Sequence, residues 1–357
     1  MLTTLIFLIV LAVLIFVHEL GHFLAARASG IRVDAFKIGF GPRLIHWKRG
    51  DTEYGVNLIP FGGFVKIHGE NPDEESTSGA DAHRSFATKP RWKQVIVLAS
   101  GVLFNFIFAW LIYSVVFMAG VTATSDSFGT SVGSFSNERI MITLISPGSP
   151  ADKAGLKEGD VLPGTSIEAI QNEISDSMGS QLAFEYMRNG ETKTVDVTPV
   201  TGLVADKYAI GIAMDEVGDL HFSFFSAIGQ SFRYTLIMIK GTAAGLYGFV
   251  ASIFHGTANL SDVSGPVGIA GIVGNAASLG FTYLLMITAL ISINLGVINV
   301  IPFPALDGGR ILFVLIEGII RRRISPRFTN TVNAVGFGLL MILMIVVTWK
   351  DVARLIK

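Results

Sequence analysis

The opening stretch of the chain, residues 2–26, is apolar and long enough to cross a membrane, yet it carries titratable side chains. It holds no Lys, Arg or Asp, and its only carboxylate is Glu19, which stands between His18 and His22 in the pattern H-E-x-x-H. Two histidines and a carboxylate are costly to place in a bilayer, so such residues in a span are functional by default. Because the stretch lacks the basic start of a secretory signal and exceeds its apolar core, we expect a retained transmembrane helix that carries a site.

His18 and His22 are four residues apart, which places both side chains on one face of a helix. Two imidazoles at this spacing can bind one metal ion, and zinc is the ion that suits the pattern. The carboxylate between them is then no ligand, because in zinc hydrolases it takes a proton from water and passes it to the leaving amine. We therefore expect His18 and His22 to bind Zn²⁺ and Glu19 to act as the catalytic base. The chain has no cysteine, which leaves His, Asp and Glu as the possible ligands.

The composition is typical of a multi-pass membrane protein, since half of the 357 residues are hydrophobic, 15% are charged and the mean hydropathy is +0.56. Three further apolar segments are near the roughly 20 residues that cross a bilayer, at about residues 94–120, 281–301 and 332–349. A fifth, residues 222–254, is interrupted by Arg233, Lys240 and glycines, and is predicted to lie on the membrane surface. The predicted fold class is a multi-pass α-helical membrane protein with four transmembrane helices.

The charges of the loops predict the orientation of these helices. Residues 27–93 carry eleven Lys and Arg against eight acids, and the loop 302–332 carries five arginines, so both are expected in the cytoplasm. Residues 120–220 carry fifteen acids against six bases, which suits the outside. With four spans both termini are then extracytoplasmic. His18 would lie about 25 Å from the outer end of its helix, towards the cytoplasmic side.

The cytoplasmic segment 28–93 is predicted to form a membrane-associated β-loop followed by a linker. It is rich in β-formers and glycine, and a substrate in extended form could add a strand to the edge of such a sheet. A plain β-loop with no binding role is the alternative. Residues 71–81 are polar and acidic and are expected to form a flexible connector. The predicted strands are residues 36–40, 44–47, 54–59 and 64–67, with a turn at residues 49–51.

An extracytoplasmic α+β module is predicted at residues 138–215, after a Ser- and Gly-rich linker at 121–137. Its pattern S-P-A-x-x-A-G-L-x-x-G-D resembles a PDZ domain of the bacterial, circularly permuted kind. Within that pattern Ser149 caps a short helix and Gly155 ends it. The other predicted elements are strands at residues 140–145 and 192–198, a helix or strand at 181–188 and a hairpin turn at Asn189 and Gly190.

A carboxylate that could complete the metal site is Asp307, which follows the third span in N-V-I-P-F-P-A-L-D-G-G. The prolines stop a regular helix, and the glycines allow a sharp turn beside the carboxylate. This span runs from outside to inside, so Asp307 reaches the depth derived for His18 and His22. Two imidazoles and one carboxylate, with a fourth position left to water, form the ligand set of a catalytic zinc. Asn294 and Asn299 could hydrogen-bond a substrate backbone or join helices to one another.

These motifs, taken in order, resemble those of site-2 proteases, and most of all the bacterial branch called regulator of sigma-E protease. They cover nearly the whole chain, although the best-known members carry two tandem PDZ domains and the outside segment here has room for one. The motifs are H-E-L-G-H, a G-x-G at Gly39 and Gly41, F-G-G-F-V-K-I, S-G-P-V-G-I-A from Ser264, and N-x-x-P-x-P-x-L-D-G-G from Asn299.

The resemblance implies an intramembrane metalloprotease of the bacterial inner membrane. Its substrate would be the transmembrane segment of a single-span protein, either an anti-sigma factor or a remnant signal peptide. Zinc would be bound by His18, His22 and Asp307, with Glu19 as the base and Asn299 at a position that engages substrate. We further hypothesise that the sheet of residues 39–67 holds the extended substrate, and we predict Gly39 and Gly41, with Asn294 and Asn299, as substrate-binding residues. The implied order of the chain is a first span (1–27), a β-loop and linker (28–93), a second span (94–120), a linker (121–137), a PDZ-like domain (138–215), a surface helical region (216–278), a third span (279–301), an L-D-G segment with a cytoplasmic loop (302–331), and a fourth span with a tail (332–357).

Two other functional classes stay open on the residues alone. A non-catalytic membrane adaptor would use the outside module to bind partners and would bind no zinc. A metal transporter would use intramembrane His, Glu and Asp as a pathway, but the chain shows no obvious internal repeat and its candidate ligands cluster at one depth. No nucleic-acid partner is expected, and the oligomeric state is not predicted.

Overall fold

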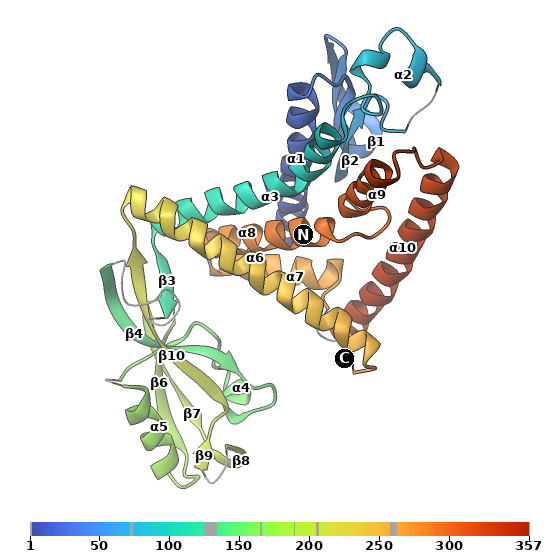
Figure 1. The fold of residues 1–357 in the computed structure, drawn as a ribbon. Helices are drawn as coiled ribbons and strands as arrows, with labels where there is room; N and C mark the ends of the chain where they lie inside the picture. Colours follow the sequence, from blue (N-terminus) through green and yellow to red (C-terminus); the bar gives the residue numbers. More distant parts are fainter. Residues whose placement is uncertain are drawn as a thin grey trace. The chain divides into compact units, whose positions relative to one another are not determined.

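The computed structural model describes residues 2–71, 74–124, 134–164, 166–188, 190–204, 207–257 and 263–356. The chain divides into two compact units (Figure 1). The first, here called the helical unit, comprises Met1–Val116 and Ile228–Lys357. The second, the insert unit, comprises Phe117–Ala227.

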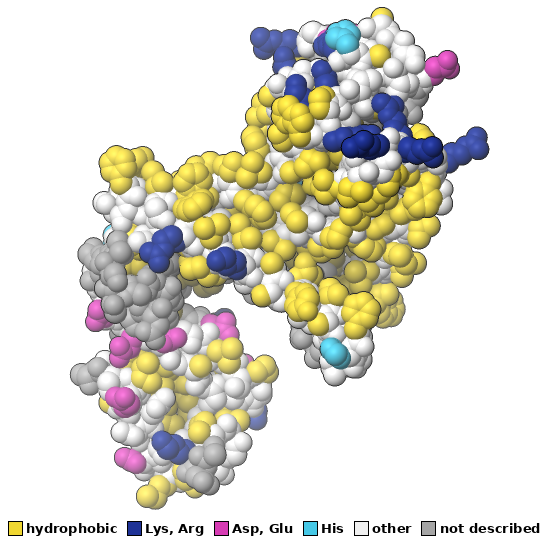
Figure 2. Space-filling model, viewed as in Figure 1, with side chains coloured by type: hydrophobic (Ala, Val, Ile, Leu, Met, Phe, Trp, Pro, Cys, Tyr) yellow, Lys and Arg dark blue, Asp and Glu magenta, His cyan; other side chains and the backbone are white. Residues whose placement is uncertain are grey.

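The helical unit is built from long apolar helices. Among the described residues, five helices are long and apolar enough to cross a membrane, namely α1, α3, α6, α8 and α10. Figure 2 shows hydrophobic side chains covering most of the visible face of this unit, with most of its Lys and Arg gathered at one end. The helices are α1 (Leu2–Ala28), α3 (Arg91–Ala119), α6 (Phe224–Phe254), α7 (Pro266–Leu279), α8 (Phe281–Val300), α9 (Asp307–Ile320) and α10 (Pro326–Ile356).

The structure adds α6 as a fifth candidate span to the four that the sequence predicts. The helices α1, α3, α8 and α10 occupy the four predicted segments, whereas α6 is a fifth candidate by length and composition. The sequence predicts a surface helix here because Arg233, Lys240 and the glycines interrupt the apolar pattern. They do not interrupt the helix, which runs unbroken for 31 residues. A side-chain charge or an isolated glycine lowers apolarity or helix propensity without removing a backbone hydrogen bond.

A β-hairpin follows α1 and consists of the antiparallel strands β1 (Val33–Arg49) and β2 (Thr52–Ile67). The four predicted short strands are segments of these two strands, joined at Gly50, whose φ is 62°. Residues 35–38 pair with 63–66 on one side and with 53–56 on the other, while 43–49 pair with 52–57. The segment 63–66 is therefore an outer strand of the folded hairpin, as the predicted substrate-binding edge requires.

Gly39 and Gly41 explain why two long strands replace four short ones. Both have left-handed φ angles, 79° and 86°, and the pairing register shifts between residues 38 and 43. Glycine accepts such angles at low cost, so the strand bends and folds over without ending.

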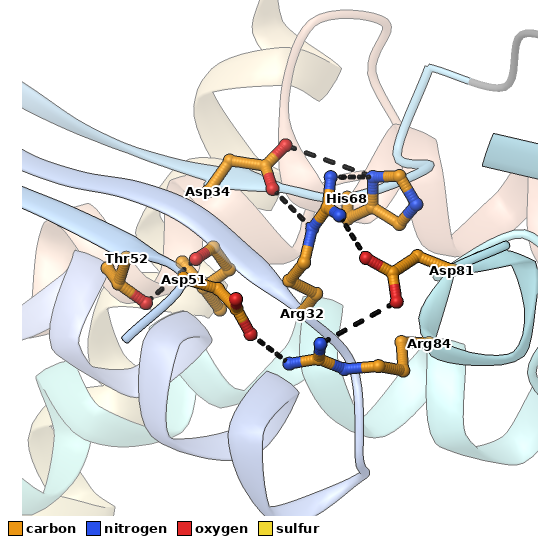
Figure 3. A network of polar contacts seen from close by, with 8 residues as sticks. Arg32, Asp34, Asp51, Thr52, His68, Asp81 and Arg84 are labelled. Atoms are coloured by element: carbon orange, nitrogen blue, oxygen red, sulfur yellow. Dashed lines mark hydrogen bonds and ion pairs between the residues drawn. The ribbon is translucent and has the colours of Figure 1, made fainter. Parts of the chain in front are cut away.

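The base of the hairpin is closed by a polar network around Arg32 (Figure 3). Its guanidinium donates to Asp34 at 2.8 Å, to Asp81, and contacts His68 Nδ1 at 2.9 Å. Nearby, Arg84 donates to Asp51, and this hydrogen bond and charge hold the pKa of the Asp51 carboxyl below its usual range. The network thus joins both ends of the hairpin to the segment that leads into α3.

The predicted flexible connector, residues 71–81, contains the short helix α2 (Glu74–Ser78), so part of it is regular structure. The 3-10 helix η1 (Ala82–Arg84) follows it. Residues 72 and 73 lie outside the described residues.

The insert unit is an α+β fold with a sheet of order β3-β10-β4-β5-β6-β7 and a separate two-stranded sheet, β8-β9. Its core is formed by residues such as Ile142 and Ile210, which are fully buried. The strands are β3 (Val121–Thr124), β4 (Ser134–Ile145), β5 (Val161–Leu162), β6 (Leu182–Arg188), β7 (Glu191–Val197), β8 (Val200–Val204), β9 (Lys207–Ala209) and β10 (Ile212–His221), with helices α4 (Pro150–Ala154) and α5 (Ile167–Asp176).

The local predictions for this module are largely confirmed. The Ser149 side chain caps α4 by accepting from the Asp152 N–H, and Gly155 ends it with a φ of 83°. Residues 140–145 lie in β4, and 181–188 resolve as the strand β6. Both ends of the predicted linker at 121–137 are strands, while its centre, and Asn189 of the predicted turn, lie outside the described residues.

Candidate metal site

The three predicted ligands converge on one point of the helical unit. His18 and His22 project from neighbouring turns of α1, and Asp307 is the first residue of α9. Asp307 Oδ2 lies 3.1 Å from His18 Nε2 and 3.3 Å from His22 Nε2, and the two Nε2 atoms are 3.2 Å apart. Among the described residues, this is the group of His, Asp and Glu side chains close enough to hold a metal ion.

The spacing of the three atoms fits tetrahedral zinc. Bonds of about 2.0–2.1 Å at tetrahedral angles place neighbouring ligand atoms about 3.3 Å apart. The observed separations of 3.1, 3.2 and 3.3 Å agree with that value. The three side chains are only 10–12% exposed, and Asp307 Oδ2 is buried without a regular hydrogen bond from any described residue. A divalent cation would satisfy that carboxylate, so the donor set fits Zn²⁺.

Each histidine is oriented by a contact to its second ring nitrogen. His22 Nδ1 lies 2.8 Å from the Val97 carbonyl of α3, to which it donates. His18 Nδ1 lies 3.1 Å from the side-chain amide of Asn105, also on α3. The Asn105 atom at this distance is Nδ2, and Oδ1 is buried without a hydrogen-bond partner among the described residues. A His18 that binds metal through Nε2 carries its proton on Nδ1, which requires the amide to be turned so that its oxygen accepts. The amide orientation follows from this hydrogen-bond requirement, because oxygen and nitrogen of an amide are assigned by their network.

Two glycines bring α1 and α3 close enough for these contacts. A Cβ atom built on Gly101 of α3 would lie 2.4 Å from His22 Nε2 and 2.8 Å from His18 Cε1. A Cβ atom on Gly21 of α1 would lie 2.4 Å from the Ser100 carbonyl oxygen. Small residues allow membrane helices to approach in this way. Gly101 and Asn105 were not predicted as site residues, although Asn105 is a polar side chain in an apolar span and could have been found by the rule that singled out Glu19.

Glu19 connects the candidate metal site to the hairpin. Its Oε2 accepts a hydrogen bond of 3.0 Å from the backbone N–H of Val65, which lies in the outer strand segment 63–66. The strand passes close to α1 at Gly63, where a Cβ would lie 3.3 Å from Ile15 Cγ2 and 3.6 Å from Glu19 Cγ. The predicted base, Glu19, is therefore next to a predicted ligand in the sequence and is hydrogen-bonded to the strand edge in the structure.

The loop that carries Asp307 differs in detail from the prediction. Gly308 and Gly309 lie in the first turn of α9, where added Cβ atoms would be 2.2 Å from the carbonyl oxygens of Val300 and Phe303. They allow close packing and do not form the turn. The left-handed residue is Ala305, with a φ of 73°, whose N–H donates to the Asn333 side chain at 3.1 Å.

The predicted substrate-binding residues have mixed surroundings. The Gly39 carbonyl accepts from the Asn57 side chain at 2.9 Å, which stabilises the bend that Gly39 and Gly41 form in the hairpin. Asn294 accepts from Thr242 of α6 at 3.1 Å, which matches the helix-joining interpretation. Asn299 is half-buried in the last turn of α8. Contact with substrate stays a prediction for all four residues.

Comparison with known proteins gives the family. The model of peptidase family M50 matches residues 6–343. This chain belongs to peptidase family M50. It is 30% identical to zinc metalloprotease RasP of Shouchella clausii over 435 aligned positions that cover 99% of both chains. It is 36% identical to a Clostridium perfringens protein named as a zinc metalloprotease, and the alignment covers 97% of both chains.

Membership confirms the resemblance to site-2 proteases drawn from the sequence motifs. The protein is a zinc metalloprotease with the composition of a multi-pass membrane protein. Membership decides against the adaptor and the transporter as the main function. The cofactor prediction of Zn²⁺ is confirmed at the level of the family, and the cluster of His18, His22 and Asp307 is the group of described residues that could hold it.

Proposed function

We propose that this enzyme cuts the transmembrane segment of a single-span membrane protein, such as an anti-sigma factor or a remnant signal peptide. The observation that carries the proposal is the meeting of a three-residue metal site, a carboxylate and a strand edge within an apolar helical unit. A membrane-embedded helix shields its own peptide bonds by hydrogen bonding, so its cleavage needs both a hydrolytic centre and a place to unwind.

The geometry supports the following proposed roles for the residues. His18, His22 and Asp307 hold the metal, and Val97 and Asn105 fix the orientation of the imidazoles. Zinc bound there supplies a Lewis acid for the scissile carbonyl and makes water a stronger acid. Glu19, beside His18, takes a proton from water and returns it to the leaving amine.

The strand edge at residues 63–66 receives the unwound substrate. Added as a further strand, the substrate satisfies its backbone groups against the hairpin and exposes one carbonyl towards the metal site. The Val65 N–H, now bonded to Glu19, is one of the edge groups that a substrate carbonyl can take over. Gly39 and Gly41 shape the hairpin, and Asn299 and Asn294 are the candidate polar contacts from α8.

The insert unit is proposed to be a PDZ-like domain outside the cytoplasm that excludes substrates with bulky outside domains. The S-P-A-x-x-A-G-L motif at α4 and the acidic surface of the unit support this assignment. The basic segment 27–93 favours a hairpin on the cytoplasmic side and an N-terminus outside, in the bacterial inner membrane. Both termini lie outside if α6 does not cross, and the same arrangement brings the end of α8, and with it Asp307, to the side of the hairpin.

A comparison of Glu19→Gln with His22→Ala tests the assignment. Both proteins are purified at full length, and zinc content and cleavage of a single-span reporter in proteoliposomes are measured. Glu19→Gln should keep its zinc and lose about 10²–10⁴-fold in cleavage rate, because only the proton carrier is removed. His22→Ala should lose zinc and activity together. Full activity in Glu19→Gln would remove Glu19 from the mechanism, and zinc retained in His22→Ala would place the metal elsewhere.

A further inference from the structure

The helix that carries Asp307 is tied to the rest of the helical unit by two ion pairs. Arg310, in the first turn of α9, bonds Glu70, which follows β2. Glu317, in the last turn of α9, receives a bond of 2.7 Å from Arg91, the first residue of α3. The two partners thus belong to the segments that also provide the strand edge and the contacts to the histidines.

One face of α9 holds all of these groups. Asp307, Arg310, Ile311, Val314 and Glu317 share a face of the helix, because each lies three or four residues from another of them. Val314 is buried in a core cluster with residues of α1, α3 and the hairpin, and Ile311 packs against it. The metal-ligand candidate therefore starts a stripe that is apolar in its centre and ionic on either side.

The placement of the two charges runs against the electrostatics of an isolated helix. A helix N-terminus favours acids and a C-terminus favours bases, yet α9 has Arg310 near its start and Glu317 near its end. The electrostatics of the helix itself therefore do not explain why Arg310 and Glu317 stand at these positions. Their partners, Glu70 and Arg91, have the opposite charges and supply one.

Position matters here because Asp307 reaches the histidines from a separate part of the chain. A metal site tolerates errors of only about 0.2 Å in ligand position. Gly308 and Gly309 pack the first turn of α9 against the end of α8 and the loop, so the direction of the rest of the helix depends on contacts further along it. The apolar contacts of Val314 favour burial but not a particular slide or tilt, since hydrophobic attraction is non-directional.

We propose that the pairs Arg310–Glu70 and Arg91–Glu317 form a clamp that holds α9 where Asp307 completes the metal site. The four side chains are positioning residues, and the inference rests on the proposed ligand role of Asp307. Because Glu70 follows the outer strand of the hairpin by a few residues, the same clamp fixes the metal ligand relative to the strand edge.

A charge exchange at one pair tests the clamp. The full-length variants Arg310→Glu, Glu70→Arg and the double exchange are purified, and zinc affinity is measured by competition with a fluorescent chelator. Each single reversal should weaken zinc binding about tenfold, in the range observed for outer partners of metal ligands. The double exchange should restore most of the affinity, because it recreates the pair with opposite polarity. The matched control is Arg139→Glu, which breaks an ion pair with Asp219 in the insert unit and should leave zinc affinity unchanged.

A spin-label distance gives a second readout that a general loss of stability would not produce. The chain has no cysteine, so cysteines introduced at the exposed positions Leu24 of α1 and Leu315 of α9 can be labelled uniquely. After zinc is removed, the distance distribution should be narrow with an intact clamp and broader in either single reversal. If the charge reversals prevent folding, Arg310→Gln and Glu317→Gln are used in their place. Glu317 accepts a hydrogen bond from the Ile324 N–H, and the glutamine keeps an oxygen that can accept it.

The outcomes separate the clamp from the proposed function. Wild-type protein that binds no zinc would overturn the metal site itself. Wild-type protein that binds zinc, with single reversals that bind equally well, would overturn the clamp alone. A double exchange as weak as the singles would also overturn it, as would a lower unfolding temperature with unchanged zinc affinity.

Discussion

One added methyl group at Gly101 should destroy the metal site although no metal ligand is substituted. The Cβ atom would lie 2.4 Å from His22 Nε2, whereas non-bonded atoms of this kind rest at about 3.5 Å. The imidazole would have to retreat by about 1 Å, which is several times the roughly 0.2 Å that a metal site tolerates. Nor can α3 move away freely, since Gly21 brings it into close contact with α1 through the Ser100 carbonyl.

The expected loss in Gly101→Ala is therefore that of a ligand, at least about 100-fold in zinc affinity, or about 2.7 kcal/mol. Chelator competition on the purified full-length protein measures it directly. The matched control is Gly241→Ala, because Gly241 lies in α6 with nothing within 4 Å of its built Cβ. Alanine there should keep zinc affinity and add up to about 1 kcal/mol of helix stability. Equal zinc affinity in the two variants would refute the close packing of α3 on the histidines.

Three further predictions concern single contacts. Asn105→Leu should lower zinc affinity by about 10–100-fold, because the imidazole it contacts loses its acceptor, and Asn105→Asp should retain more affinity in the same titration. Arg188→Ala leaves Asp160, which is 1% exposed, without its ion partner, so the insert unit should lose about 2–3 kcal/mol in urea unfolding while zinc binding is unaffected. Asp351→Ala removes the carboxylate that accepts a hydrogen bond of 2.8 Å from the Gly268 N–H in the first turn of α7. The free energy of unfolding should fall by about 1–2 kcal/mol in thermal unfolding, and by less in Asp351→Asn. An unchanged unfolding temperature would contradict this role.

The metal site could be predicted from the sequence because its signals are local or follow from topology. The spacing of His18 and His22 fixes their common face, and the direction of the third apolar segment brings Asp307 to the same depth. The structure places all three side chains together, as that reasoning required. The distances among them could not be predicted, since they depend on the packing of α1, α3 and α9.

The elements that sequence patterns missed share a physical cause, which is backbone geometry. Gly39 and Gly41 let one strand bend where glycine usually indicates an end, so the hairpin has longer strands than predicted. The helix α6 is present as predicted, and its Arg233 and Lys240 lower the apolarity of the segment without breaking the backbone hydrogen bonds. Periodicity and hydropathy describe side chains, and neither records how a backbone bends or continues.

The turn of α1 that carries Glu19 is enclosed by backbone on two sides, and this enclosure explains why glycines matter as much as the reactive side chains. On one side, the outer strand approaches at Gly63, where a Cβ would lie 3.3 Å from Ile15 Cγ2 and 3.6 Å from Glu19 Cγ. On the other, α3 approaches at Gly101. The Val65 N–H reaches Glu19 only because the strand is this near, and the Val97 carbonyl reaches His22 only because α3 is. A larger residue at Gly101 would separate the ligands from their acceptors, although every reactive side chain would still be present, whereas Gly63 leaves more room for an added methyl group.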